Sequence, residues 1–410
     1  MTYVKSLVCR GCFEEYPIEP LNVCEMCFGP LEITYDYESI SKNISRESIS
    51  AGPFSVWRYD AFLPVSRENA VDIGTGFTPL TKAENLGSRL GLNNLYIKND
   101  SVNPTFSFKD RPVTVTATKA LEFGFDVLAC VSTGNLMGSV AAHGAKAGMK
   151  TIVFFPENLE QSKQVSASIY GPIMVAVDGN YDQVNRLGSE LADNRNWAFV
   201  NINMRPFYAE GSKTLGYEVA EQLGWKSPDN CIVPAASGEL FTKIWKGLKE
   251  FSDVGLIEEP HTRMFLAQAA GCSPIVSASK SGDKVVNPVV PETLAKSLAI
   301  GNPASGPFAL ETILETDGGA VATPEEEIVT GIELLAETEG IFTETAGGVV
   351  VSSLKKLAES GEIDPDDVTV IFITGNGLKT QEVVTGGVNL VKTGPSFSEF
   401  EKSIGSKANF

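Results

Sequence analysis

Residues 103–111 read Asn-Pro-Thr-Phe-Ser-Phe-Lys-Asp-Arg, and the proline near the start of this stretch predicts a loop that ends where a helix begins at Lys109. A lysine at a helix N-terminus is disfavoured as a cation, because that end of the helix dipole is positive. If Phe106 and Phe108 also shield it from water, its pKa falls and its amine becomes a candidate for Schiff-base formation. The alternative is a surface lysine beside two charged neighbours. The unfavourable placement favours the chemical interpretation.

Outward from this stretch, short apolar runs alternate with amphipathic segments. Strands are predicted at 95–98, 127–131, 151–155, 173–177, 231–233, 264–267 and 368–373, and helices at 111–123, 137–147 and 241–251. Apolar strands that alternate with helices predict parallel sheets covered on both faces. There are too many units for one doubly wound sheet, so the sequence predicts an α/β fold with two such domains. Residues 41–78, which are mixed polar and aromatic, are expected to form a connecting segment.

Three of the predicted strands end in small, polar or glycine residues, and ligands of open α/β sheets bind at the carboxyl ends of strands. These junctions are residues 132–135, 235–240 and 374–377. Free backbone N–H groups at such junctions can hold an anion, and small residues let the backbone approach a phosphate closely. In the third junction, two glycines around Asn376 permit a sharp turn. Each junction also fits an ordinary capped helix or tight turn, so no single one identifies a ligand.

Several motifs in order are more specific than any one of them. The stretch 103–111 and the Ser-Thr-Gly-Asn junction after it resemble the Schiff-base motif and following loop of fold-type II enzymes, which use pyridoxal 5′-phosphate (PLP). Further motifs resemble the threonine synthase family, at residues 200–206 and 210–214, 300–303 and 373–379. The resemblance covers nearly the whole chain. It implies two doubly wound domains of tryptophan synthase β-like architecture behind a small zinc-ribbon-like segment.

The resemblance also implies a role for each matching position. Lys109 would bind PLP covalently and move protons, Asn135 would hydrogen-bond the 3′-oxygen, and Thr374 would meet the pyridine nitrogen. The PLP phosphate would lie in the loop Ala236, Ser237, Gly238, Glu239 and Leu240, and the substrate phosphate against Ser132, Thr133, Asn203 and Arg205. These roles are physically reasonable, because an arginine suits bidentate phosphate contacts and a neutral threonine leaves the pyridine nitrogen less protonated than an aspartate would.

Glu239 departs from the glycine- and asparagine-rich phosphate loop of many members of the family. A carboxylate this close to a dianion repels it unless the side chain points away. The sequence leaves the orientation of the Glu239 side chain open.

Two Cys-x2-Cys pairs lie near the N-terminus. Cys9 and Cys12 form the first pair, and Cys24 and Cys27 form the second. Four thiolates favour a tetrahedral metal, with zinc expected and iron as the alternative. Because all four positions are cysteines, no position is left for a water, and the metal is predicted to be structural. Four unliganded thiols remain the alternative.

We therefore expect three parts along the chain. Residues 1–40 form the metal knuckle, residues 41–114 and 206–410 form a large PLP-binding domain, and residues 115–205 form a small α/β domain. A homodimer is expected for such a fold.

Composition narrows the classes of partner. The formal net charge of -18 repels phosphate backbones, so binding to nucleic acid is not expected. No apolar run reaches the ~18 residues that span a membrane, and no secretory signal is visible at the N-terminus. The seven cysteines, four of them in a metal pattern, indicate a reducing cytoplasm. The two histidines, His143 and His261, do not support a Ser-His-Asp triad.

The expected reaction is the conversion of O-phospho-L-homoserine and water to L-threonine and phosphate. A related replacement on another phosphorylated amino acid, such as cysteate synthesis from O-phosphoserine and sulfite, would use the same groups on a shorter substrate. Threonine deamination is a weaker alternative, because it does not need Arg205 as a phosphate clamp. A zinc-ribbon protein that binds nucleic acid or a partner protein belongs to a different class, and it predicts that Lys109 is dispensable.

Overall fold

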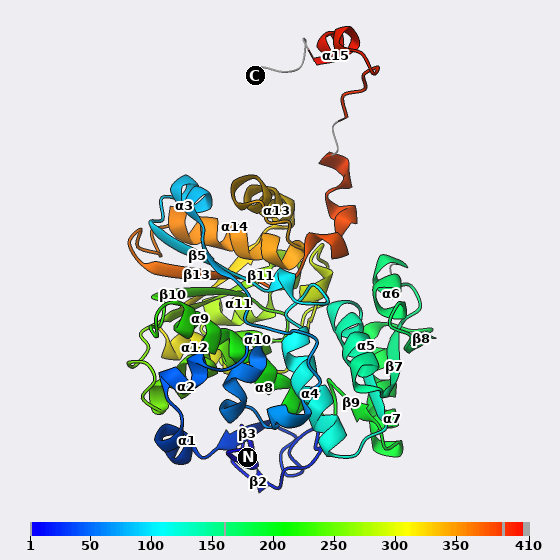
Figure 1. Cartoon of the computed structure of the whole chain (residues 1–410), viewed down its shortest axis with the longest axis vertical. Helices are drawn as coiled ribbons and strands as arrows, with labels where there is room; N and C mark the ends of the chain where they lie inside the picture. The colour runs from blue at the N-terminus through cyan, green and yellow to red at the C-terminus, as the bar shows by residue number, and fades with distance from the viewer. Residues whose placement is uncertain (1, 160, 388–389, 405–410) are drawn as a thin grey trace.

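The structure is a computed structural model that describes residues 2–159, 161–387 and 390–404. The described strands form a six-stranded sheet, a four-stranded sheet and a three-stranded sheet. The six-stranded sheet with its helices makes the main body in Figure 1, the four-stranded sheet lies to its right, and the three-stranded sheet lies at the bottom.

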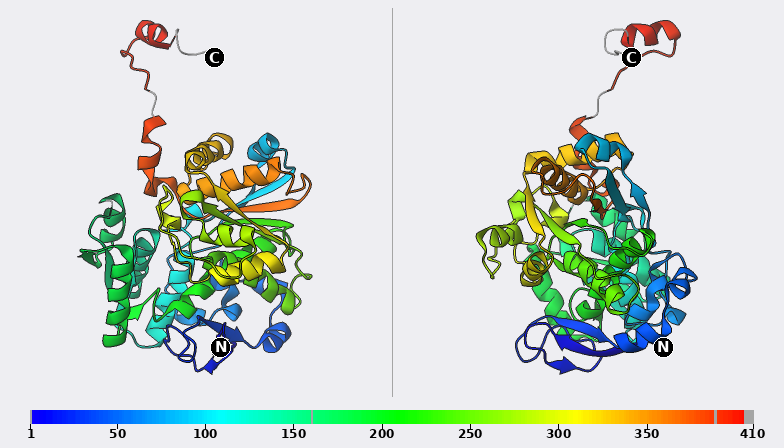
Figure 2. Two further views of the ribbon diagram at one scale, coloured as in Figure 1. Left: turned by 180° about the vertical axis from the view of Figure 1, so that it is seen from behind. Right: turned by 90° about the vertical axis from the view of Figure 1, so that its left-hand side faces the viewer.

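The six-stranded sheet is parallel except at one edge. Its order is β12 (Gly319–Thr323), β11 (Arg263–Ala269), β10 (Asn230–Pro234), β13 (Val368–Ile373), β5 (Asn94–Asn99) and β4 (Leu80–Lys82), and only β4 runs antiparallel to its neighbour. The central strand β10 is buried along its whole length, as expected of a strand covered on both faces. One face carries α3 (Glu84–Leu90), α13 (Glu325–Glu339) and α14 (Thr345–Glu359). The other face carries α9 (Thr214–Gln222), α10 (Glu239–Asp253), α11 (Pro274–Ser281) and α12 (Gly306–Glu315) (Figures 1 and 2).

The four-stranded sheet is parallel throughout. Its order is β8 (Ile173–Val177), β7 (Lys150–Pro156), β6 (Val127–Val131) and β9 (Ala198–Phe199), and it packs with α5 (Asn135–Ala147), α6 (Gln161–Ser168) and α7 (Tyr181–Asn194). Two packed helices, α4 (Asp110–Glu122) and α8 (Arg205–Ser212), connect it to the main body. They approach most closely at Gly211, where a Cβ atom would lie 2.3 Å from the carbonyl oxygen of Arg111.

The two parallel sheets confirm the predicted α/β class. All described strands of the six-stranded sheet lie in residues 80–99 and 230–373, and those of the four-stranded sheet lie in 127–199. The predicted division of the chain into domains stays a prediction.

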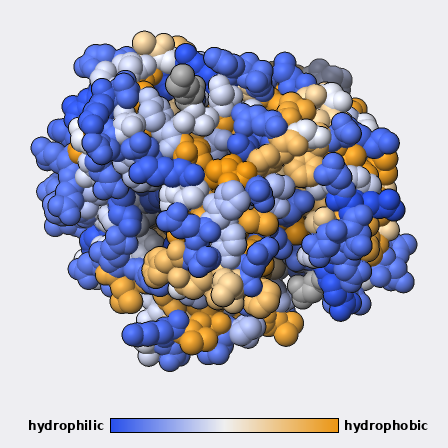
Figure 3. All heavy atoms as spheres, turned by 90° about the horizontal axis from the view of Figure 1, so that it is seen from below, coloured by the Kyte–Doolittle hydropathy of each residue, from blue (hydrophilic) through white to orange (hydrophobic). Residues whose placement is uncertain are grey.

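The N-terminal segment is an antiparallel sheet of β1 (Val4–Cys9), β2 (Glu15–Tyr16) and β3 (Leu31–Tyr35), followed by α1 (Tyr37–Asn43) and α2 (Arg46–Ser50). Two phenols attach it to the main body: Tyr35 donates a hydrogen bond to Glu210 at 2.7 Å, and Tyr37 donates one to Glu250 at 2.6 Å. Seen from this end, apolar side chains lie among polar ones on the surface (Figure 3).

Residues 41–78 are more than the connecting segment that the sequence predicts. The 3-10 helix at Val56–Phe62 is almost wholly buried. Tyr59 and Phe62 pack against Tyr217 and Phe251 with ring centroids 5.2–6.0 Å apart. These aromatic side chains were visible in the sequence and explain why the segment belongs to the core.

Short 3-10 helices and one helix that stands apart complete the described chain. Short 3-10 helices lie at Arg67–Asn69, Asp100–Val102, Ala270–Cys272, Lys296–Leu298, Gly377–Lys379, Gln381–Val383 and Thr385–Gly387. The helix α15 (Phe397–Ile404) stands apart from the rest of the molecule in all three ribbon views. In the described ranges, we find no helix with both the length and the apolar character needed to cross a bilayer.

Candidate active site

A cavity of about 550 Å³ lies where the two parallel sheets face each other. We call it the site cavity. Its walls include the residues that follow the carboxyl ends of β6, β10 and β13, so the three predicted junctions meet there. Ten of the predicted site residues line it: Lys109, Ser132, Thr133, Asn135, Ala236, Ser237, Gly238, Glu239, Leu240 and Thr374. Its volume is in the range of small-molecule and cofactor sites.

Lys109 immediately precedes α4, and its amine lies in an aromatic environment. The amine is 4.3 Å from the ring centroid of Phe108 and 5.6 Å from that of Tyr208. Burial lowers the pKa of the amine to about 8, although the charges of Glu344 and Glu239 act in the opposite direction. Among the described residues, no hydrogen-bond partner holds this amine. It is therefore available for chemistry in the cavity.

Asp110 shapes the loop that carries Lys109. Its carboxylate accepts hydrogen bonds from the backbone N–H and hydroxyl of Thr105 at 2.7 and 2.6 Å, and from the hydroxyl of Ser139 at 2.6 Å. Phe106, at the tip of the loop, is exposed, has a left-handed backbone (φ 63°) and does not line the site cavity. The shielding that the sequence assigned to Phe106 is therefore supplied by Tyr208.

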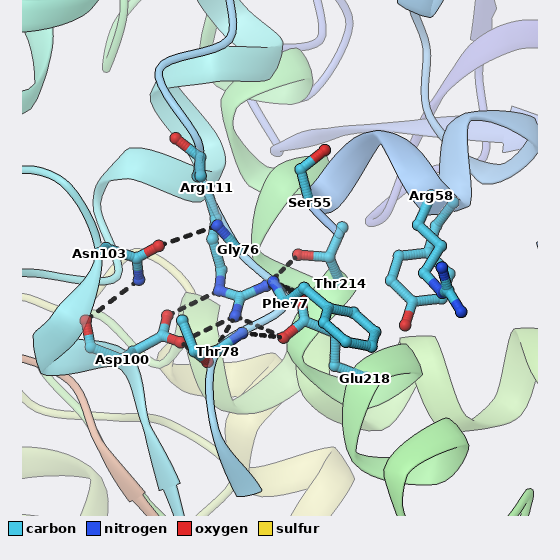
Figure 4. Close-up of polar contacts among 12 residues, drawn as sticks. Ser55, Arg58, Gly76, Phe77, Thr78, Asp100, Asn103, Arg111, Thr214 and Glu218 are labelled. Atoms are coloured by element: carbon cyan, nitrogen blue, oxygen red, sulfur yellow. Dashed lines mark hydrogen bonds and ion pairs between the residues drawn. The ribbon is translucent and has the colours of Figure 1, made fainter. Parts of the chain in front are cut away.

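This loop is hydrogen-bonded to a buried network of four charged side chains, Lys98, Asp100, Arg111 and Glu218. The guanidinium of Arg111 donates to Asp100 at 2.6 and 2.8 Å and to Glu218 at 2.5 and 2.8 Å, and Figure 4 shows it between these carboxylates. Lys98 donates to Glu218 at 2.6 Å. Burial would raise the pKa of Glu218, but Arg111 and Lys98 outweigh it and lower that pKa to about 2. Asn103 joins the start of the loop to this network through Gly76 and Asp100.

The junction after β6 begins α5. The hydroxyl oxygen of Ser132 accepts hydrogen bonds from the backbone N–H groups of Gly134 at 3.1 Å and Met137 at 3.3 Å. Asn135, the first residue of α5, donates its side-chain amide to both carboxylate oxygens of Glu344, at 3.1 and 2.9 Å. The amide is thus fixed at the cavity wall.

Glu344 is a site residue that the sequence did not indicate. It directly precedes α14 and lines the site cavity. Burial raises the pKa of its carboxyl, while the hydrogen bond from Asn135 and the charges of Lys379, Lys163 and Lys109 act against this rise. No motif marked this residue, because it lies in a different part of the chain from every predicted junction.

The loop after β10 places Gly238 at the N-terminus of α10 with a left-handed backbone (φ 87°), which explains the glycine. The structure shows the orientation that the sequence left open: the carboxylate of Glu239 accepts a hydrogen bond from Ser305 at 2.5 Å and lies 3.7 Å from the guanidinium of Arg205. Burial would raise the pKa of Glu239, but Lys243 and Arg205 outweigh this effect and lower it. The positive charge of Arg205 therefore partly offsets the negative charge of Glu239 beside the proposed phosphate loop.

The junction after β13 carries Thr374, whose carbonyl oxygen accepts the backbone N–H of Phe108 at 2.9 Å. The next two glycines, Gly375 and Gly377, do not have a left-handed backbone. They allow close approach instead. A Cβ at Gly375 would lie 2.2 Å from the carboxylate of Glu344, and one at Gly377 would lie 2.3 Å from the ring of Phe342.

Two predicted residues lie outside the described lining of the site cavity. The side-chain amide of Asn203 bonds to the backbone N–H of Phe199 at 2.8 Å and to the carbonyl of Trp197 at 3.0 Å. Arg205 lines a much smaller cavity of about 10 Å³ on the other side of Glu239. Their role toward a substrate phosphate stays a prediction.

The four cysteines of the N-terminal pairs come together. Their sulfur atoms all lie within 4.8 Å of one another, and the Cys9–Cys27 and Cys12–Cys24 pairs are 3.4 and 3.5 Å apart. Sulfurs around a tetrahedral zinc, at about 2.3 Å from the ion, are separated by about 3.8 Å, so the set fits such an ion. Burial would raise the pKa of Cys24, but hydrogen bonding from the Tyr16 hydroxyl and the backbone outweighs it and lowers that pKa to about 6. A thiol held near the thiolate form is what a metal ligand requires.

The sequence of this chain is similar to those of known PLP-dependent enzymes. The family described as "Pyridoxal-phosphate dependent enzyme" matches residues 71–375. The threonine synthase of Methanocaldococcus jannaschii is 42% identical over 375 residues, which cover 90% of this chain and 92% of that protein. The chain belongs to the threonine synthase family of PLP-dependent enzymes.

A further threonine synthase and several solved structures are also similar to this chain. The threonine synthase of Methanosarcina acetivorans is 39% identical over 92% of this chain and 93% of its own length. Among solved structures, threonine deaminase isoform 2 from Solanum lycopersicum superposes with a TM-score of 0.63 at 20% identity, over 88% of this chain and 92% of that chain. Diaminopropionate ammonia lyase from Escherichia coli has a TM-score of 0.65 at 18% identity, over 77% and 89% of the two chains. These structural likenesses show the fold-type II architecture.

The site cavity fits the cofactor of the family. It offers a buried lysine amine with a lowered pKa, the positive N-terminus of α10 beside small residues, and room for a small molecule. The hydroxyl of Thr380, which also lines the cavity, is buried without a partner among the described residues. A buried polar atom of this kind indicates a place for a polar ligand.

Proposed function

We propose that this enzyme converts O-phospho-L-homoserine and water to L-threonine and phosphate in the site cavity. The observation that carries the proposal is the Lys109 amine, which is buried, has a pKa of about 8 and lies where the three strand-end junctions meet. PLP, when bound, supplies an electron sink for charge that develops on the substrate carbons. The rest of the chemistry falls to residues of this chain.

The cofactor would be held at four places. Lys109 would bind its carbonyl carbon, and Asn135, fixed by Glu344, would lie against its 3′-oxygen. The backbone of residues 236–240 at the start of α10 would hold its phosphate, and Thr374 would meet the pyridine nitrogen. In support, all of these residues line one cavity.

Lys109 would also move the protons. A lysine with a pKa of about 8 is neutral in roughly a tenth of molecules at pH 7, far more than at the ordinary value of about 10.4, so its amine can accept the proton from the α carbon of the substrate. The same group would assist proton transfer at the β carbon. Phosphate would leave from the γ carbon, which then takes up a proton to become the methyl group, and water would add its hydroxyl at the β carbon while the α carbon regains a proton.

The substrate phosphate would lie against Ser132 and Thr133 at the start of α5, where free N–H groups favour an anion. Arg205 and Asn203 remain proposed contributors. For this, Arg205 would exchange its contact with Glu239, and Asn203 would exchange its backbone hydrogen bonds, for the phosphate.

The test is phosphate release from O-phospho-L-homoserine by PLP-loaded protein, with product analysis for threonine. O-Phospho-L-serine with sulfite is the alternative substrate to compare. It is shorter than O-phospho-L-homoserine by one methylene, and a pocket distinguishes two substrates that differ by one methylene by only about 1–3 kcal/mol, so the two reactions must be measured side by side. Threonine formation at a higher kcat/KM supports the proposal. Faster turnover of O-phosphoserine, or no phosphate release, would contradict it.

We further propose that the four-cysteine cluster holds zinc, that the enzyme is a homodimer in the cytoplasm, and that its domains are residues 1–40, 41–114 with 206–410, and 115–205. All seven cysteines are free thiols, which supports a reducing compartment. Elemental analysis of wild-type protein and Cys24→Ser tests the metal, and light scattering tests the assembly.

A further inference from the structure

The N-terminal knuckle contacts the helix on which the proposed phosphate loop rests. Arg10, between Cys9 and Cys12, places its guanidinium carbon 3.7 Å from the ring centroid of Phe308 in the first turn of α12. Its backbone N–H donates to the carbonyl of Pro30 at 3.0 Å, which ties the backbone of Arg10, inside the first cysteine pair, to the segment that follows the second pair. An arginine over an aromatic ring is a favourable and oriented contact.

Ser305, at the start of α12, holds the loop directly. Its backbone N–H donates to the carbonyl of Ser237 at 3.1 Å, and its hydroxyl donates to Glu239 at 2.5 Å. A Cβ at Gly238 would lie 3.1 Å from the carbonyl oxygen of Ser305, so the loop lies tightly against the start of α12. A shift of α12 is therefore passed to the loop.

A second contact joins the N-terminal sheet to the helix that the loop begins. Lys243 on α10 donates to Glu32 of β3 at 2.5 Å, and Lys246 lies 3.3 Å from the same carboxylate. The small cavity between these elements has about 10 Å³, which is room for at most about one water. This cluster is thus a packed contact rather than a ligand site.

We propose that Arg10 is a positioning residue for the phosphate loop of the cofactor, and that the metal knuckle sets its position. A tetrahedral metal fixes the cysteines on both sides of Arg10, Arg10 holds Phe308, and α12 holds the loop through Ser305. The proposal rests on the proposed role of residues 236–240 toward the PLP phosphate. It assigns to the knuckle a role in cofactor retention, in addition to local stability.

The test measures the Kd of PLP for cofactor-depleted full-length protein by absorbance titration, together with the phosphorus NMR shift of the bound PLP phosphate. We expect Arg10→Ala to raise the Kd about three- to tenfold, the effect of one partly exposed cation–π contact. Arg10→Lys should lose less. Removal of the metal with a chelator should raise the Kd in the wild type and add little in Arg10→Ala.

The matched control is Arg46→Ala, which removes another arginine of the N-terminal part, one that lies over Trp225 rather than Phe308. If Arg10→Ala does not fold, Phe308→Leu tests the same contact. An unchanged Kd and phosphorus shift in the Arg10 or Phe308 variant, or an equal loss in Arg46→Ala, would overturn the inference while wild-type PLP binding stands. Failure of the wild type itself to bind PLP would instead refute the proposed function.

Discussion

Replacement of Arg111 by methionine should destabilise the protein far more than loss of an exposed arginine. The guanidinium makes six hydrogen bonds in a buried site, two to Asp100, two to Glu218 and two to threonine hydroxyls. Without it, Lys98 alone faces two buried carboxylates. Removal of one partner from such a network costs about 3–5 kcal/mol, because the remaining charge stays buried and unpaired. Urea unfolding followed by tryptophan fluorescence measures the change.

Two further variants make this prediction specific. Arg89→Met removes an exposed partner 3.9 Å from Glu337, and it should cost at most about 1 kcal/mol. The double variant Arg111→Met/Glu218→Gln leaves Lys98 with Asp100 only, so it should be more stable than Arg111→Met alone. Two results would contradict this prediction. One is that Arg111→Met lowers the free energy of unfolding no more than Arg89→Met does. The other is that the double variant lowers it by the sum of the losses in Arg111→Met and Glu218→Gln.

Three further predictions concern the cavity and pH. Gly375→Ala puts a Cβ 2.2 Å from the Glu344 carboxylate, so PLP affinity in an absorbance titration should fall about tenfold, as expected for overpacking of 1–3 kcal/mol, whereas Gly386→Ala, with open space around its Cβ, should have no effect. The rate of PLP uptake in stopped-flow absorbance should rise with pH with a midpoint near 8, because the neutral Lys109 amine reacts; a midpoint near the ordinary lysine value of about 10.4 would contradict the burial argument. The folded-state pKa of Glu218, about 2, lies below its usual 4.5, so its charge stabilises the protein above pH 4.5 and this stabilisation is lost as pH falls toward 2; acid unfolding that is unaffected by Glu218→Gln would contradict it.

Much of the fold could be predicted because buried parallel strands are continuous apolar runs. The strands β6, β8 and β13 begin and end at the predicted residues. The strands β1, β2, β3, β4, β9 and β12 were not predicted. Three of them, β2, β4 and β9, have only two or three residues, which is too few to show a periodic pattern. The strand ends also indicated where the cavity would lie, since parallel strands bring their carboxyl ends to one edge.

The contacts between distant segments could not be predicted. Glu344 reaches Asn135 across 209 positions of sequence, and no local pattern marks it. The sequence showed that Glu239 beside a phosphate loop needs compensation, but only the fold brings Arg205 and Ser305 to it. For the same reason, the sequence placed Asn203 near the site but could not show that its side-chain amide is hydrogen-bonded to the backbone of Phe199 and Trp197.

The most direct test of the central claim locates the lysine that binds the cofactor. Holoenzyme is treated with borohydride, which makes a bond between PLP and a lysine permanent, and the labelled peptide is identified by mass spectrometry. Three other lysines, Lys163, Lys296 and Lys379, line the same cavity, so the result discriminates within the site. If PLP is bound to Lys109, the label lies on Lys109 in the wild type and is absent from Lys109→Ala. A label on another cavity lysine in the wild type, or no label at all, would contradict it.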